Sequence, residues 1–275
     1  MTLEALLQNP NALPTAPKVV EQLISSFNDP DVSVDAIART LSTDPVLSAK
    51  LLRLANSAYY HVSRSIGTVD DAVRMLGFVT VRTLVISSGL VSGFKTVPGL
   101  DLKRFWRYSL HAAVAAKWIA RKSGENSDLA FTIGMMHAIG QLVIHAGKPE
   151  QAQALDKIAG PYDPRRFSEE MVAFGYDFSE VGAELALRWK FPDVFPETIR
   201  DFPEPMRQSP LNRMAVVVHL AVWRAQVEEC QPGPEALAAG LPQAAAQSIG
   251  IEAASLLDEM PPLAELSAGL EELVH

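Results

Sequence analysis

The sequence predicts an all-α protein, because helix signals recur along its length and strand signals are almost absent. Apolar residues make up 48% of the 275 residues, which is enough for a substantial core. Residues that cap helices stand before several apolar stretches, and prolines and glycines separate these stretches. The length suits one large domain or two closely packed ones.

Residues 33–60 predict a pair of helices joined by a short turn. Ser33 can cap the first helix. Asp44 can cap the second, because its carboxylate accepts orphan backbone N–H groups and Pro45 at the first helical position needs no partner. Apolar residues of the second helix then recur at helical spacing: Leu47, Leu51, Leu54 and Ala55.

Two further helices are predicted after this pair. Thr68 and Asp71 have the spacing of a capping box, and Gly77 suits the left-handed position at the end of that helix. Residues 79–90 are rich in Val and Thr, but their length and apolar spacing favour a buried helix over a strand.

A link between two helical lobes is predicted at residues 94–101, which contain Pro98 and Gly99. Beyond it, helices are predicted at residues 105–122, 129–146, 179–191 and 209–227. We expect the helix at 129–146 to be buried and the helix at 179–191 to be capped by Ser179. The predicted segments are an N-terminal lobe at 1–100, a second lobe at 101–205, and helices at 206–275 that complete the second lobe and end in an acidic tail.

Charge and cysteine content narrow the function. The formal net charge is -8, and nine acidic residues but no Lys or Arg follow Arg224. This distribution argues against nucleic-acid binding, which needs cationic surface. Cys230 is a single cysteine, so an intramolecular disulfide and a multi-thiolate zinc site are both excluded. Without a signal peptide or an uninterrupted apolar stretch of about 18 residues, we expect a cytoplasmic protein that does not enter a membrane.

The stretches LPTAP, DPVLSAKLLRLANSAYY and SIGTVDDAVRMLGFVTVRTLVI follow one another between residues 13 and 86. In this order they resemble the HDOD domain, a bacterial all-helical signalling module related to the HD and HD-GYP phosphohydrolases. RLANSAYY, residues 53–60, is the most telling part. The resemblance extends from about Leu13 to about Phe202, and it implies a two-lobed fold whose C-terminal lobe is an HD-like helical bundle.

Active HD enzymes hold a metal with a first histidine, a His-Asp pair and a distant aspartate on different helices. By the resemblance, these positions fall on Tyr108, His137, Ala138 and Val222. One imidazole cannot hold a catalytic metal, which needs several nitrogen and oxygen ligands and an open position for water. The resemblance therefore implies a degenerate site, with no catalysis, no bound metal and no cofactor.

An alternative is a site rebuilt from other residues. His111 lies on roughly the same helix face as Tyr108, and with His137 and His219 it could form a three-histidine zinc site. The candidate ligand pocket therefore contains Tyr108, His111, His137, Gln141 and His219. No Asp or Glu stands on the inner face of these helices as a general base. The basic residues between 103 and 122 are expected to be solvated, with anion binding as the alternative.

Asn56, Ser57, Tyr59 and Tyr60 of the signature stretch have two interpretations: they order the following loop, or they present it to a partner. The function predicted from all these features is a non-catalytic signalling or scaffold protein. Its partner would be a signalling protein in trans, and a homodimer is a further option. The alternative function is a residual metal-dependent phosphohydrolase or a nucleotide-binding protein.

Overall fold

The computed structural model describes residues 2–9, 12–13, 18–26, 34–42 and 44–274. All regular elements in these ranges are helical, which confirms the all-α prediction. The chain begins with α1 (Leu3–Leu7), α2 (Lys18–Ser25), α3 (Val34–Ser42), α4 (Pro45–Ala55), α5 (Val69–Leu76) and α6 (Phe78–Gly93). It continues with α7 (Leu102–Ser123), α8 (Ser127–Met136), α9 (Ile139–Gly147), α10 (Pro149–Asp156), α11 (Arg166–Phe174), α12 (Phe178–Arg188) and α13 (Val194–Asp201). The remaining elements are η1 (Pro205–Arg207), α14 (Arg213–Cys230), α15 (Pro234–Ala239), α16 (Gln243–Ser248), α17 (Ser255–Asp258), α18 (Leu263–Leu266) and η2 (Glu271–Leu273).

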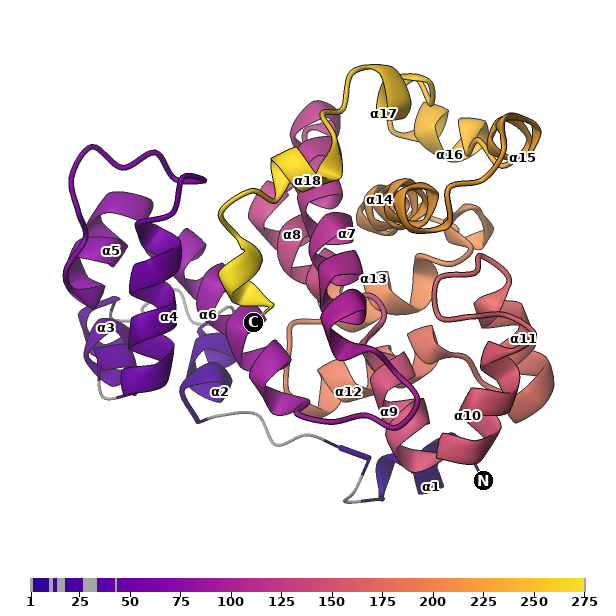
Figure 1. Cartoon of the computed structure of the whole chain (residues 1–275), viewed down its shortest axis with the longest axis horizontal. Coiled ribbons are helices and arrows are strands. Elements are labelled where there is room, and N and C mark those ends of the chain that lie inside the picture. The colour runs from indigo at the N-terminus through magenta and orange to yellow at the C-terminus, as the bar shows by residue number, and fades with distance from the viewer. Residues whose placement is uncertain (1, 10–11, 14–17, 27–33, 43, 275) are drawn as a thin grey trace.

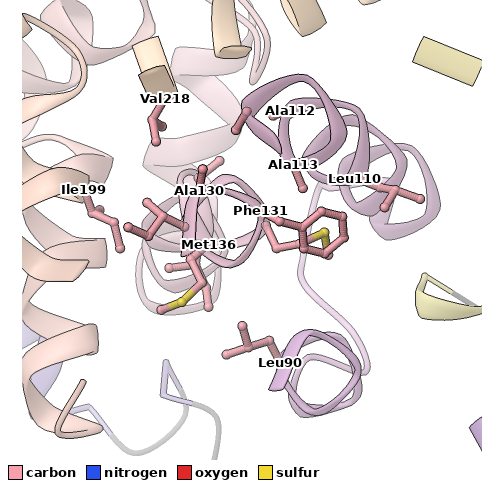
Figure 2. Close-up of a cluster of buried hydrophobic side chains, with 14 of the residues drawn as sticks. Leu90, Leu110, Ala112, Ala113, Ala130, Phe131, Met136, Ile199 and Val218 are labelled. Atoms are coloured by element: carbon pink, nitrogen blue, oxygen red, sulfur yellow. The ribbon is translucent and has the colours of Figure 1, made fainter. Parts of the chain in front are cut away.

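Helix α8 lies at the centre of the core. It packs against α6, α7, α13 and α14, and Figure 2 shows its Phe131 and Met136 among side chains of these neighbours. Small residues bring α7 and α8 together, because a Cβ on Gly134 would lie only 2.7 Å from Cα of Ala113. Such close packing makes the core sensitive to added volume.

The helices α2–α6 pack on one another. The first and last elements of the described chain each pack on helices that are distant in the sequence. Helix α1 packs on α9 and α12, where Arg188 donates a 2.5 Å hydrogen bond to the carbonyl of Leu7. At the other end, η2 packs on α4 and α6, and Arg53 pairs with Glu272 at 3.2 Å. Figure 1 shows the N label beside α1 and below α10, and the C label beside α6. The division near residues 100 and 206 stays a prediction, and these two segments lie across it.

Several predicted helix ends are confirmed. Asp44 caps α4 with its carboxylate, Thr68 accepts from the backbone N–H of Asp71, and Gly77 ends α5 with a φ of 82°. The predicted cap at Ser33 falls outside the described residues. One cap was wrong: Asp177, two residues before Ser179, accepts from the first N–H groups of α12. The carboxylate competes better for these donors than a hydroxyl because its hydrogen bonds are charge-assisted.

The expected continuous helix at 129–146 is two helices, α8 and α9, with a turn at His137 and Ala138. Helix α9 starts against the first turn of α12, since a Cβ on Gly140 would lie 2.0 Å from the carbonyl oxygen of Phe178. Together, residues 127–147 are long and apolar enough to cross a membrane, contrary to our expectation of shorter stretches. The fold accounts for this composition, because 89% of the most apolar window is buried inside it.

Candidate functional site

One cavity of about 220 Å³, called the central cavity below, collects most of the predicted site residues. Its wall includes Tyr108, His137, Gln141, Arg166, His219 and Val222. Three of the four positions that the resemblance assigns to metal ligands therefore line one space. The fourth, Ala138, is buried at the start of α9 and does not line the cavity.

His137 is a buried neutral imidazole. Its Nδ1 lies 2.7 Å from the carbonyl oxygen of Gly134, which can only accept, so Nδ1 carries the proton and donates. Burial lowers the pKa of His137 to about 4, against the opposing effect of this hydrogen bond. Nε2 is therefore an unprotonated acceptor, and among the described residues it has no hydrogen-bond partner.

Tyr108 and Val222 stand at two of the positions that the resemblance assigns to metal ligands. The Tyr108 ring packs edge-on against His137 at 5.2 Å and at a tilt against Tyr162 at 4.8 Å. Burial raises the pKa of Tyr108, so its phenol stays protonated and cannot serve as an anionic ligand at neutral pH. Val222 offers no donor atom. Both side chains make this part of the wall apolar or aromatic.

Gln141 and Arg166 add polar groups to the residues that line the cavity. Gln141 was expected there from the sequence, and Arg166 was not. The Gln141 amide nitrogen donates to the carbonyl of Pro161 at 3.0 Å, while its Oε1 is buried without a partner in the described structure. Arg166 donates through Nε to Glu170 at 2.6 Å and through Nη1 to Asp156 at 2.5 Å. Its Nη2 is buried and unpaired within the described ranges. The four-residue spacing of Arg166 and Glu170 was the sequence signal for this pair.

The two acidic partners of Arg166 respond differently to their surroundings. Burial raises the pKa of Glu170, against the hydrogen bonds that it accepts from Arg166 and from the backbone of Phe178. Burial alone would also raise the pKa of Asp156, but hydrogen bonds from His145 and Arg166 hold it below its usual value. The guanidinium is thus fixed on one side of the cavity wall.

The residues present do not fit a catalytic metal. His219 lines the cavity and its Nδ1 lies 2.9 Å from the carbonyl of Phe202, so its Nε2 also accepts. Burial lowers the pKa of His219 and keeps it neutral. Two imidazoles are fewer than the three or four protein ligands that a zinc site uses. No group of three or more His, Cys, Asp or Glu side chains placed to hold a metal occurs among the residues described.

The structure does not bring His111 into the central cavity. It lines a separate pocket of about 560 Å³ with Arg104, Arg107 and Glu229. Position 111 is three residues after Tyr108, and this rotation about α7 is enough to direct the imidazole to another space. Burial lowers the pKa of His111. A site of three histidines is therefore not formed by His111, His137 and His219 in this arrangement.

The acidic C-terminal region pairs with the basic residues of α7. Glu229 accepts from Arg104 at 3.0 Å and from Arg107 at 2.8 Å, and Glu259 pairs with Lys122. The expectation that these charges are simply solvated was incomplete, because Arg104, Arg107 and Lys122 each pair with an acidic residue from the C-terminal region.

The signature residues lie where α4 leads toward α5. The Asn56 side chain donates to the carbonyl of Ile66 at 2.8 Å and accepts from its N–H at 2.7 Å, which closes the loop between them. Tyr59 and Tyr60 stack edge-on at 4.9 Å and line a pocket of about 530 Å³ with Lys117. Ser57 Oγ is buried without a partner in the described part of the chain. Asn56 thus has the loop-ordering contacts, while both tyrosines remain half-buried at a pocket wall.

The HDOD domain profile matches residues 13–205. The chain belongs to the HDOD domain family. A relative in Treponema pallidum (strain Nichols), an uncharacterised protein, is 24% identical over 190 residues. These residues are 68% of this chain and 37% of the relative, so the HDOD chain spans little more than a third of the relative's length.

Solved structures show the same HDOD fold. A proposed phosphohydrolase from Shewanella amazonensis SB2B is 33% identical, with a TM-score of 0.77 and coverage of 98% of this chain and 97% of that one. An HDOD domain protein of unknown function from Geobacter sulfurreducens is 25% identical, with a TM-score of 0.75 and coverage of 98% and 94%. A proposed signal transduction protein from Marinobacter aquaeolei VT8, 22% identical, shares the fold with a TM-score of 0.73 over 97% of this chain and 59% of that one.

Proposed function

We propose that this chain is a non-catalytic signalling module that acts by binding a signalling protein. The observation that carries the proposal is the set of side chains at the former ligand positions. Tyr108 is a protonated phenol, Val222 has no donor atom, and only His137 keeps a ligand type. One imidazole among these positions cannot hold the ion that would lower the pKa of a water to make a nucleophile there.

The relatives support both a signalling and an enzymatic interpretation. The Marinobacter protein is a proposed signal transduction protein, and the Shewanella protein is a proposed phosphohydrolase. The matched part is 37% of the Treponema relative and 59% of the Marinobacter chain, but 97% of the Shewanella chain and 94% of the Geobacter chain, so similar proteins include both longer chains and chains of about this length. The residues at the ligand positions favour the signalling alternative.

A residual phosphohydrolase is the second candidate, and one observation favours it. Both His137 and His219 donate through Nδ1 to a backbone carbonyl, which is how metal-binding histidines are commonly oriented. This arrangement leaves Nε2 of both rings as an acceptor, and both residues line the central cavity.

Metal content and hydrolysis distinguish the two functions. The purified chain is incubated with Mn, Fe, Zn and Mg salts, desalted, and analysed by mass spectrometry, alongside His137→Ala and the control His111→Ala. We expect substoichiometric metal in all three proteins and no hydrolysis of phosphate esters. Near-stoichiometric metal that is lost in His137→Ala and kept in His111→Ala would overturn the proposal.

Binding to a partner is tested separately by crosslinking in a native bacterial lysate. The expected result is one enriched signalling protein that also binds the purified chain in a reciprocal titration. Failure of every enriched protein in that titration would count against the signalling function.

A further inference from the structure

We propose that the pocket beside Tyr59 and Tyr60, called the tyrosine pocket below, docks an acidic segment of a partner protein. The pocket has a volume of about 530 Å³, and it is lined by the signature stretch and by residues of α5–α8 and α18. The inference rests on the proposed function and adds to it the place and the chemistry of partner binding.

Several hydrogen-bond donors on the residues of this pocket are accessible to solvent. The phenol oxygens of Tyr59 and Tyr60 and the indole nitrogen of Trp118 have no hydrogen-bond partner within the described part of the chain. The buried side-chain atoms that lack a partner include none of these three, so solvent reaches each of them. Burial of most of the ring raises the pKa of Tyr60, so its phenol keeps its proton and can donate.

The charges around the tyrosine pocket favour an anion. Asp128 lines it, but Lys117 pairs with this carboxylate at 3.1 Å. Arg121 also lines the pocket, is exposed, and forms no ion pair with any residue that the structure describes. One positive charge is therefore uncompensated in the wall of a pocket on a chain of net charge -8. A carboxylate that enters the pocket gains charge-assisted hydrogen bonds from this guanidinium.

The C-terminal segment already places acidic and leucine side chains on the signature stretch. Glu272 pairs with Arg53 at 3.2 Å, and a Cβ on Gly269 would lie 3.0 Å from the backbone nitrogen of Tyr59. Leu266 of the same segment lines the tyrosine pocket. Figure 1 shows this segment running from α18 beside α7 to the C label beside α6. A partner segment with a carboxylate next to a leucine would continue the same kind of contact into the pocket.

Size and apolar wall complete the description of the occupant. A volume of about 530 Å³ lies within the ~300–1,000 Å³ of sites that hold small ligands, so it suits a few side chains and not a whole helix. Met75, Leu76 and Val114 give part of the wall an apolar surface for the leucine. A basic segment would be repelled by Arg121, and a wholly apolar one would leave the donors unpaired.

Fluorescence anisotropy on the full chain tests the proposal. The probe is a labelled peptide with the sequence of residues 263–274, LAELSAGLEELV, and the contrast peptide has glutamine in place of its three glutamates. Arg121→Glu reverses the charge at the pocket, and Tyr60→Phe removes one donor but keeps the ring. Arg39→Glu is the matched control, because it reverses an exposed arginine of α3 that does not line the pocket. Inorganic phosphate serves as a competitor.

The expected result is binding of the acidic probe that weakens as salt is raised. Arg121→Glu should weaken it at least fivefold, Tyr60→Phe at least threefold, and Arg39→Glu less than twofold. No binding up to millimolar concentration, equal binding of the glutamine peptide, or binding that Arg121→Glu leaves intact would each overturn the inference.

Two outcomes would assign the pocket to another occupant and also overturn the inference. Phosphate that displaces the probe at a lower concentration than unlabelled peptide would indicate a small phosphate ligand. A dimer in sedimentation that Arg121→Glu dissociates would indicate a second copy of this chain. A metal-free protein that fails to bind the probe refutes the docking site alone, whereas a protein that holds metal through His137 refutes the proposed function.

Discussion

Replacing Gly140 by alanine tests whether the start of α9 is held against α12 by direct backbone contact. The added Cβ would lie 2.0 Å from the carbonyl oxygen of Phe178 and 2.8 Å from the N–H nitrogen of Gly182. Ordinary contact begins near 3.4 Å, so the helices must separate by about 1.4 Å. Neither backbone atom can rotate away, as the end of a flexible side chain could.

The expected cost follows from two opposing terms. Overpacking of a well-packed core costs about 1–3 kcal/mol, and a direct backbone clash belongs at the upper end of this range. Alanine recovers at most about 1 kcal/mol through its helix propensity. The free energy of unfolding should therefore fall by about 2 kcal/mol, which corresponds to a Tm lower by roughly 4–8 °C for a chain of this size.

Differential scanning calorimetry of Gly140→Ala measures this change. Gly160→Ala is the control, because a Cβ there would meet nothing closer than the carbonyl oxygen of Asp156 at 3.8 Å. The control should melt with the wild type. A Tm of Gly140→Ala within ~2 °C of the wild type would correspond to less than about 1 kcal/mol. This result would refute the close approach of α9 and α12.

Three further predictions use the free energy of unfolding in urea or the exchange of single amides. As pH falls from about 6.5 to 4, the free energy of unfolding of the wild type should fall by up to about 3 kcal/mol relative to His137→Phe. The reason is that the imidazole binds a proton in the unfolded chain but not in the buried site. Parallel pH profiles of the two proteins would contradict the pKa of about 4. Arg166→Met should cost about 3–5 kcal/mol, since it removes the cationic partner of the fully buried Glu170, whereas Arg165→Met, at an exposed pair, should match the wild type; equal effects would rule out this difference. Asn56→Ala should cost about 1–2 kcal/mol and speed hydrogen exchange at the N–H of Ile66, and unchanged exchange would exclude the loop-closing bond.

Local features of the fold could be predicted from the sequence because their causes are local. Asp44 before Pro45 and Thr68 three residues before Asp71 place donors and acceptors within one turn. The cap of α12 was assigned to Ser179 because two capping residues stand within three positions, and only the geometry shows that Asp177 accepts the bonds. The break between α8 and α9 lies just before the close contact of Gly140 with α12, a contact between distant segments that no local pattern reports.

The candidate site was predictable to the extent that the resemblance to HD enzymes assigns its positions. Tyr108, His137 and His219 were expected in one pocket and share one cavity. The prediction was wrong for His111, because a three-residue step along α7 is not a full turn and His111 lines a different pocket. Arg166 was missed because its burial depends on carboxylates supplied by two other positions, one of them outside its own helix.

The crossed ends of the fold bear on the order in which it can form. Helix α1 contacts partners that are synthesised well over a hundred residues later, and η2 returns to helices made near the beginning. Neither lobe can therefore reach its final packing during synthesis before distant sequence is available. Contacts of such long range slow folding and leave apolar faces exposed in the meantime. A tag or fusion placed after η2 would lie close to α4 and α6, and it could therefore disturb the packing of helices that are far from it in the sequence.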